Sequence, residues 1–256
     1  MPDRTILKLG GSVITEKGSG GAGIIREETL SKVARALREH SDLPLLLIHG
    51  AGSCGHPQAQ QYNIQSGVTR ENRQGIYETH LAVSELNNMV VRFLRKEGIE
   101  AIGVHPFEGM VASDGELAGY CLDHLNLMIS LGIVPVLHGD VVMDVRKGAC
   151  IVSGDQLVRV LAEQLGMKRI GLATDVPGLL DADGSVVREL RRGVARTIRI
   201  EGSGHVDVTG GMQGKIKELL RLADMGIESE IFHISRLSDF LSCADHGGTQ
   251  VMPEVT

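Results

Sequence analysis

Three lysines in glycine-rich surroundings are the side chains of this sequence best suited to phosphate chemistry. Lys8 precedes Gly10-Gly11, Lys17 precedes a glycine-dense stretch, and Lys215 follows Gly214. Phosphoryl transfer requires positioning and neutralisation of the charge on the transferred group, and an ammonium on a flexible stem suits both tasks. Each lysine alone is typical of a surface charge. Together they predict a site that holds a polyphosphate and the group to which it is transferred.

A second candidate for phosphate binding is the stretch from His49 to His56, which reads HGAGSCGH. Its three glycines let the backbone turn tightly and approach a ligand, and free N–H groups in such a turn form a concavity suited to phosphate. A plain turn from a strand into a helix explains the same residues. The stretch lacks the GxxxxGK[ST] ending of a P-loop, and the N-terminal strand is not followed by GxGxxG, which disfavours P-loop NTPases and dinucleotide enzymes.

Alternating strands and helices must position these groups. Short apolar runs predict strands at residues 5–9, 45–48, 101–104, 133–137, 169–173 and 231–234, and the tail at 245–251 is read as a glycine turn followed by a short final strand. Helical periodicity predicts helices near residues 27–39, 70–96, 122–131 and 157–165, and a further helix that begins after Thr209 as N-cap and runs to about residue 225. The segments 16–23 and 105–121 are expected to be loops. This alternation is typical of an α/β fold with a parallel sheet covered by helices. Ligands of such folds collect at the carboxyl ends of the strands, here at Gly10-Gly11-Ser12, at His49-Gly50 and at His138-Gly139-Asp140.

The composition excludes several classes of partner. The chain has 256 residues, 42% hydrophobic residues, a mean hydropathy of +0.04 and a formal net charge of −6. We therefore expect an ordinary globular protein with no nucleic-acid partner. No apolar stretch reaches the roughly 18 residues that span a bilayer, so no membrane partner is expected. Four cysteines without a CxxC pair predict reduced thiols and a cytoplasmic location, and Cys54 as a nucleophile is the less favoured interpretation.

Six motifs in order carry a resemblance to a known family: LKLGGS, HGAGSCGH, LHGD, SGDQL, ATDVPGLL and TGGMQGK. The sequence resembles the amino acid kinase superfamily over nearly its whole length, and Gly55-His56-Pro57 resembles the isopentenyl phosphate kinases within it. The resemblance implies a three-layer αβα sandwich with a mainly parallel central sheet. It also implies one domain over 1–256, with a substrate-binding lobe at about 1–150 and a nucleotide-binding lobe at about 151–256.

The activity that this resemblance implies is transfer of the γ-phosphoryl group of ATP to isopentenyl phosphate, which gives isopentenyl diphosphate in a variant mevalonate route to isoprenoids. It also implies a homodimer, and Mg²⁺ that bridges the phosphates of ATP with few or no protein ligands. Phosphorylation of fosfomycin or another small acid is the alternative within the fold. A non-catalytic nucleotide-binding module is the alternative from another class, although a sensor needs no transition-state stabilisation by three lysines.

The resemblance also assigns roles to individual residues. The catalytic residues that it implies are Lys8, Lys17, His56 and Lys215. Among them, Lys17 stabilises the transition state and Lys215 reaches the β- and γ-phosphates. The nucleotide lies against Lys8, Gly10, Gly11, Ser12, Gly52, Asp175, Gly211 and Lys215. The acceptor phosphate lies against Ala51, His56 and Gly154. Family members often have glycine at the position of Ala51 and an aromatic residue at that of Cys54. The methyl group that Ala51 adds is expected either to tighten the phosphate pocket or to change its selectivity modestly.

His56 has a role that follows from its chemistry. An imidazole N–H is a good donor to a phosphate dianion, and the dianion favours the protonated ring. The acceptor phosphate is already ionised, so His56 is expected to bind and orient it without acting as a base. The other histidines, including His49, His138 and His246, are expected to be structural. Asp155 is interpreted first as a helix cap, and the helix near Tyr77–Phe93 as the wall of an apolar pocket whose individual residues are mostly core.

Overall fold

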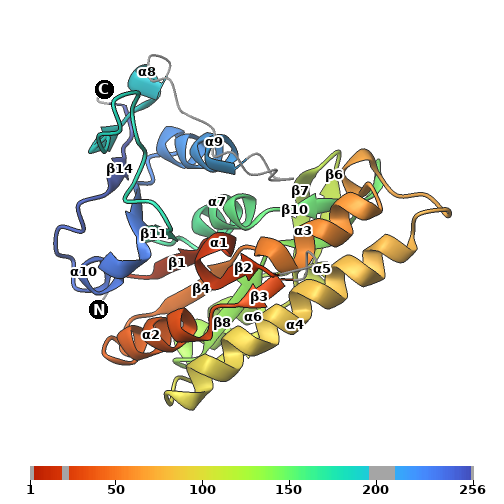
Figure 1. Cartoon of the computed structure of the whole chain (residues 1–256), viewed down its shortest axis with the longest axis horizontal. Helices are drawn as coiled ribbons and strands as arrows, with labels where there is room; N and C mark the ends of the chain where they lie inside the picture. Colours follow the sequence, from red (N-terminus) through yellow and green to blue (C-terminus); the bar gives the residue numbers. More distant parts are fainter. Residues whose placement is uncertain (1–2, 19–22, 196–210, 255–256) are drawn as a thin grey trace.

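A computed structural model describes residues 3–18, 23–195 and 211–254 of the chain (Figure 1). Its largest feature is an eight-stranded sheet in the order β12-β14-β13-β11-β1-β4-β8-β5. All neighbouring strands are parallel except β13 and β14. The bounds are β12 Glu189–Leu190, β14 Thr249–Val251, β13 Ser229–His233, β11 Arg169–Thr174, β1 Thr5–Leu9, β4 Leu45–His49, β8 Val134–His138 and β5 Ala101–Gly103.

The apolar runs of the central strands are buried because helices cover both faces of this sheet. Side chains alternate along a strand, so Leu45 and Leu47 of β4 join one apolar cluster while Leu46 and Ile48 join the other. The first cluster is completed by α2 (Glu27–Arg38), α4 (Gln74–Lys96) and α10 (Leu237–Leu241). The second is completed by α6 (Asp123–Ser130), α7 (Gly154–Gln164) and α9 (Gly211–Asp224). Figure 1 shows α7 and α9 on one side of the central strands and α2 and α4 on the other, which confirms the predicted three-layer sandwich.

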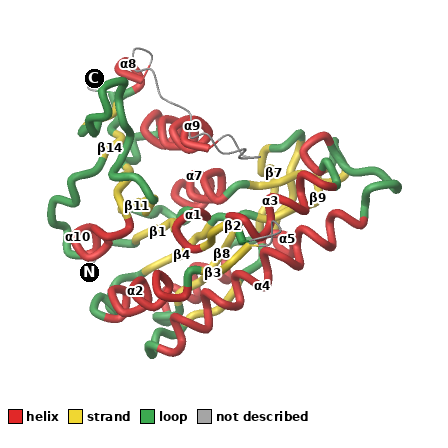
Figure 2. Tube along the Cα trace, viewed as in Figure 1, coloured by secondary structure: helices red, strands yellow, loops and turns green. Residues whose placement is uncertain are grey.

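Two smaller sheets complete the fold. One has the order β10-β9-β6-β7 and lies at the end of the molecule away from β14 (Figure 2). Its strands are β6 (Met110–Ser113), β7 (Glu116–Tyr120), β9 (Asp140–Asp144) and β10 (Gly148–Val152). The other is the hairpin of β2 (Thr15–Lys17) and β3 (Gly23–Ile25). The remaining short elements are α1 (Gly11–Ile14), α3 (Gly52–Gln61), α5 (Pro106–Gly109), α8 (Arg192–Ala195), η1 (Ile64–Ser66) and η2 (Ile234–Arg236).

The smaller sheets correct the expectation of loops at 16–23 and 105–121. In the second segment Asp114 and Gly115 both have positive φ, at 54° and 86°, and this turn joins β6 to β7. Gly10-Gly11-Ser12 was also expected to be a loop, but Gly11 and Ser12 begin α1. Among the described residues, no helix is both long and apolar enough to cross a membrane.

Candidate active site

Two lysines and one carboxylate meet at the carboxyl end of the central strand β1. Lys8 Nζ donates to Asp155 Oδ1 at 2.6 Å, and Lys215 Nζ donates to the same oxygen at 3.3 Å. Lys8 lies in β1 on the face covered by α7, Asp155 lies in the first turn of α7, and Lys215 lies near the start of α9. All three are buried, with relative exposures of 5%, 8% and 8%. Three segments far apart in sequence therefore build one charged centre.

Burial and pairing set the charge of this centre. The pKa of Lys8 is lowered to about 8, mainly by burial; Lys215 also lowers it, while Asp155 acts in the opposite direction. Burial alone raises the pKa of Asp155, but the ammonium groups of Lys215 and Lys8 outweigh that effect and hold the pKa at about 2. At neutral pH the centre therefore holds two cations and one anion. Its excess positive charge suits a phosphate group at the adjacent strand ends.

Close backbone contacts join the turns after β1 and β4. A Cβ atom on Gly11 would lie 2.5 Å from the Cα of Gly52, and one on Gly50 would lie 2.7 Å from the nitrogen of Gly11. Gly52 has φ +54°, and a Cβ there would lie 2.1 Å from Thr15 Oγ1. Only glycine fits such contacts. They bring the starts of α1 and α3 together, and the positive end of a helix dipole is suited to anions.

Gly154, at the start of α7, lies against both Lys8 of β1 and the end of β4. A Cβ on Gly154 would lie 3.2 Å from Lys8 Cε and 3.3 Å from the carbonyl oxygen of His49. Ser153 caps α7, since its hydroxyl accepts from the N–H of Gln156 at 3.1 Å. Capping was the first interpretation of Asp155, and it is wrong because Ser153 takes that position and leaves the Asp155 carboxylate to the two lysines.

The residues expected to bind the acceptor phosphate lie on or beside α3. Ala51 immediately precedes α3, and His56 lies within it, half-buried. The sequence predicted a loop at this position. A Cβ on Gly55 would lie 2.4 Å from Cγ1 of Val83, so α3 packs directly against α4. This close packing fixes the helix that carries His56.

The other predicted nucleotide residues occupy the same edge of the main sheet or helix starts near it. Asp175 is exposed and follows β11, the neighbour of β1. Gly10 donates its N–H to Ala173 at 2.9 Å, and Ser12 is exposed in α1. Gly211 begins α9 with φ +53°. The backbone of Lys17 pairs with Gly23 in β2 and β3, and its side chain lies outside the described part of the structure.

Histidines at neighbouring strand ends form a second polar cluster. His49 and His138 are fully buried and stacked, with ring centroids 5.5 Å apart. His49 Nε2 bonds Asn87 Oδ1 at 3.0 Å, and His138 Nε2 bonds His105 Nδ1 at 2.8 Å. Burial lowers the pKa of His49 and that of His138, so these rings are neutral. Their expected structural role agrees with this bonding, as does that of His246, which pairs with Glu230 at 2.5 Å.

One polar contact near this cluster was not anticipated from the sequence. His80 of α4 bonds Asp140, which follows the end of β8, at 3.0 Å. The hydrogen bond to Asp140 raises the pKa of His80, whose side chain is 23% exposed. Asp140 was singled out only as part of a strand-end motif, and α4 was expected to present an apolar wall. The α4 residues Val83, Leu86, Val90 and Leu94 are core, as expected, whereas Tyr77 is 63% exposed.

Comparisons with known proteins agree with this architecture. The chain is 38% identical to an isopentenyl phosphate kinase of Haloferax volcanii over 97% of the chain and 98% of the relative. It is 38% identical to that of Methanothermobacter thermautotrophicus over 89% and 90%. A solved isopentenyl phosphate kinase structure superposes with a TM-score of 0.86 at 33% identity, covering 97% of this chain and all of the other. The Amino acid kinase family model matches residues 3–233, and the chain belongs to that family.

Proposed function

We propose that this protein transfers the γ-phosphoryl group of ATP to isopentenyl phosphate and produces isopentenyl diphosphate. The observation that carries this proposal is the buried pair of Lys8 and Lys215 around a single carboxylate, at the edge where the glycine turns meet. The relatives named above supply the acceptor. The product would enter isoprenoid biosynthesis through a variant mevalonate pathway.

Each side chain has a distinct task in the proposed reaction. Lys215 contacts the β- and γ-phosphates, Lys8 follows the charge of the transferred group between donor and acceptor, and Lys17 adds positive charge in the transition state. Asp155 keeps the two buried ammonium groups apart and oriented. Such positioning and charge stabilisation account for most catalysis of phosphoryl transfer.

His56 and Gly154 act on the acceptor. A dianionic phosphate oxygen is already a nucleophile, so the reaction needs no general base. His56 donates a hydrogen bond to that phosphate and aligns one oxygen with the γ-phosphorus. Gly154 leaves room beside Lys8, since a side chain there would meet the lysine stem. Ala51 borders the same position at the start of α3.

We further propose that ATP brings Mg²⁺ with it. The metal would be held by phosphate oxygens and would neutralise their charge during transfer. In the described ranges, no three His, Cys, Asp or Glu side chains converge into a metal site. Asp175, exposed after β11, would face the nucleotide from the same edge.

The assembly, the lobes and the location are also proposals. We propose a homodimer, as implied by the family resemblance. We propose that residues 1–150 mainly bind the acceptor, because α3 and α4 lie there, and that 151–256 mainly bind the nucleotide, because β11 and α9 lie there. We propose a cytoplasmic location because the protein would use ATP and because its described cysteines are free thiols. Among them Cys150 is buried, and burial raises its pKa to about 12.

A substrate panel tests the proposed function. ADP release is measured with isopentenyl phosphate, fosfomycin, glutamate and carbamate as acceptors, and the product is identified by mass spectrometry. We expect the highest kcat/KM with isopentenyl phosphate. A preference for glutamate or carbamate overturns the acceptor assignment, and ATP binding without turnover of any acceptor favours a regulatory module. The role of Lys215 is tested by Lys215→Ala in the same assay. Lys217→Ala is the matched control for this variant, since Lys217 is exposed on the same helix.

A further inference from the structure

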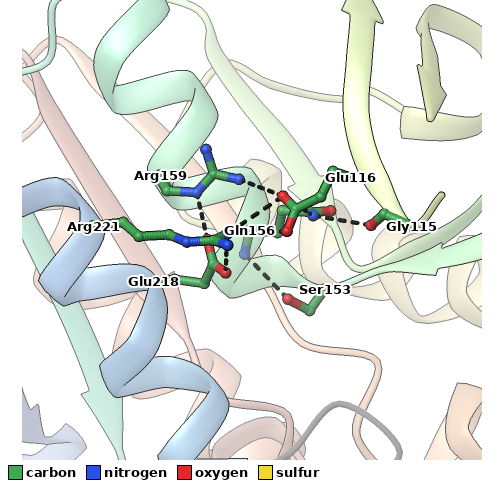
Figure 3. Close-up of polar contacts among 7 residues, drawn as sticks. All are labelled: Gly115, Glu116, Ser153, Gln156, Arg159, Glu218 and Arg221. Carbon is green, nitrogen blue, oxygen red and sulfur yellow. Dashed lines mark hydrogen bonds and ion pairs between the residues drawn. The ribbon is translucent and has the colours of Figure 1, made fainter. Parts of the chain in front are cut away.

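A closed ring of four charged side chains joins three elements beside the candidate active site (Figure 3). Arg159 Nε donates to Glu218 at 2.5 Å, and Arg221 donates to Glu218 at 3.0 Å. Glu116 completes the ring, since it accepts from Arg159 at 3.0 Å and from Arg221 at 3.1 Å. Gln156 adds a donor to Glu116 at 3.1 Å. The ring therefore ties α7 and α9 to β7 of the smaller sheet.

This ring continues the charged centre along the same pair of helices. Asp155 and Arg159 lie one turn apart on α7, and Lys215 and Glu218 lie nearly one turn apart on α9. The contacts between α7 and α9 thus form two successive ion pairs, Asp155–Lys215 and Arg159–Glu218. Their polarity is reversed, because α7 supplies first the acid and then the base.

The reversed polarity defines the position of α9 along α7. If α9 moved by one turn, Glu218 would approach Asp155 or Lys215 would approach Arg159, and each contact would join like charges. The second pair is largely removed from solvent, with side-chain exposures of 16% for Arg159 and 11% for Glu218. Charges removed from water interact more strongly than surface charges. The Arg159–Glu218 pair therefore opposes sliding and rotation of α9.

We propose that Arg159 and Glu218 are positioning residues for Lys215, and that Glu116 couples the β6–β7 hairpin to the same helix. This inference rests on the proposed role of Lys215 in nucleotide binding and transfer. Phosphoryl transfer is sensitive to ångström-scale misplacement of a charge-stabilising group. Lys215 lies near the beginning of α9, so contacts along the helix decide where its ammonium lies.

Glu218→Gln and Arg159→Met test the positioning role. Each variant removes one charge of the Arg159–Glu218 pair and keeps most of the side-chain volume. We expect kcat to fall about 10-fold or more and the KM for ATP to rise, while the KM for the acceptor changes less than about twofold. Glu163→Gln on α7 and Lys217→Ala on α9 are exposed controls and should keep wild-type constants. Wild-type constants in both test variants overturn the proposal.

The double variant Arg159→Met with Glu218→Leu separates positioning from stability. Replacing a buried ion pair by apolar residues of similar size often restores or increases stability. We expect the urea midpoint of the double variant to lie closer to the wild-type value than the midpoints of the two single variants. Its kcat and its KM for ATP should stay impaired, because apolar contacts do not fix the helix position. Recovery of wild-type kinetics together with stability overturns the inference. Wild-type activity of Lys215→Ala would instead refute the site assignment on which the inference rests.

Discussion

Replacement of Asp155 by asparagine tests the charged centre directly. At an effective dielectric constant of about 20, unit charges at the 2.6 Å and 3.3 Å separations of Asp155 from Lys8 and Lys215 attract by roughly 6 and 5 kcal/mol. The Asp155→Asn variant loses both attractions and keeps two buried ammonium groups close together. Burial already holds the pKa of Lys8 at about 8. The variant should therefore release the Lys8 proton more easily.

The size of this effect follows from the conversion between pKa and free energy. One pKa unit corresponds to about 1.4 kcal/mol. Even if only about a quarter of the lost Lys8–Asp155 attraction acted on the Lys8 proton, the pKa of Lys8 would fall to about 7 or below. A large share of the variant would then carry neutral Lys8 at neutral pH, and both lysines would lose their anchor. We expect kcat to fall about 100-fold, the usual scale for loss of one aligned electrostatic group.

Activity measured across pH provides the assay. The wild-type rate should decline above about pH 8 as Lys8 loses its proton, and this decline should begin at lower pH in Asp155→Asn. Urea unfolding should show a loss of stability at pH 7, on the scale of about 3–5 kcal/mol for a broken buried pair, and a smaller loss at pH 9, where Lys8 is neutral. Glu163→Gln, exposed on α7, is the control. Wild-type kcat with an unchanged alkaline decline would refute the reasoning.

Three further predictions concern neighbouring residues. His56→Ala should leave the Kd for ATP within about twofold by calorimetry and lower kcat for isopentenyl phosphate about 100-fold; unchanged kinetics would contradict the role of His56. Gly52→Ala should lower the free energy of unfolding by about 3 kcal/mol or more, because its Cβ would lie 2.1 Å from Thr15 Oγ1. Gly98→Ala is the comparison variant and should lower the free energy of unfolding by only about 1 kcal/mol, since Gly98 has φ +82° but open space around it. Equal losses of free energy in the two variants would refute the steric argument. Asp140→Asn should lower the pKa of His80, measured by NMR, because the bond to Asp140 raises it. The stability gained from this raised pKa is present below the unfolded-state pKa and is lost as pH rises through the folded-state value, so Asp140→Asn should flatten that dependence in urea unfolding.

The central sheet and the lysines were predictable because their signals are local. Strands buried on both faces have continuous apolar runs, as Leu45 to Ile48 show, and glycine turns mark their carboxyl ends. Lys8 was noticeable because a charge within such a run requires an anionic partner. The residue types therefore predicted a charged site at the strand ends, where the structure places Lys8 and Lys215 against Asp155.

The second sheet was missed although part of its signal was present. Asp114-Gly115 lies between two short segments, and an Asp-Gly pair is a strong indicator of a hairpin. Its strands contain Ser113, Glu116 and Gly119, which weaken the apolar alternation. The role of Asp155 could not be predicted locally, because its two partners lie far away in sequence. The same holds for His80, whose partner Asp140 belongs to another element.

The alternation of side chains in β1 has a consequence for folding. Leu7 and Leu9 belong to the layer with α2 and α4, while Lys8 lies on the opposite face beside Asp155. A shift of β1 by one residue would exchange these faces and place the ammonium among leucine, valine and phenylalanine side chains. Burial of an unpaired charge costs several kcal/mol, so the misaligned strand is disfavoured by the charge of Lys8 as well as by lost apolar contacts. Hydrogen exchange during refolding of Lys8→Met, which removes that charge, would detect slower fixation of the β1 register. The lysine proposed to contact phosphate would thus also select the pairing of the central strand while the chain folds.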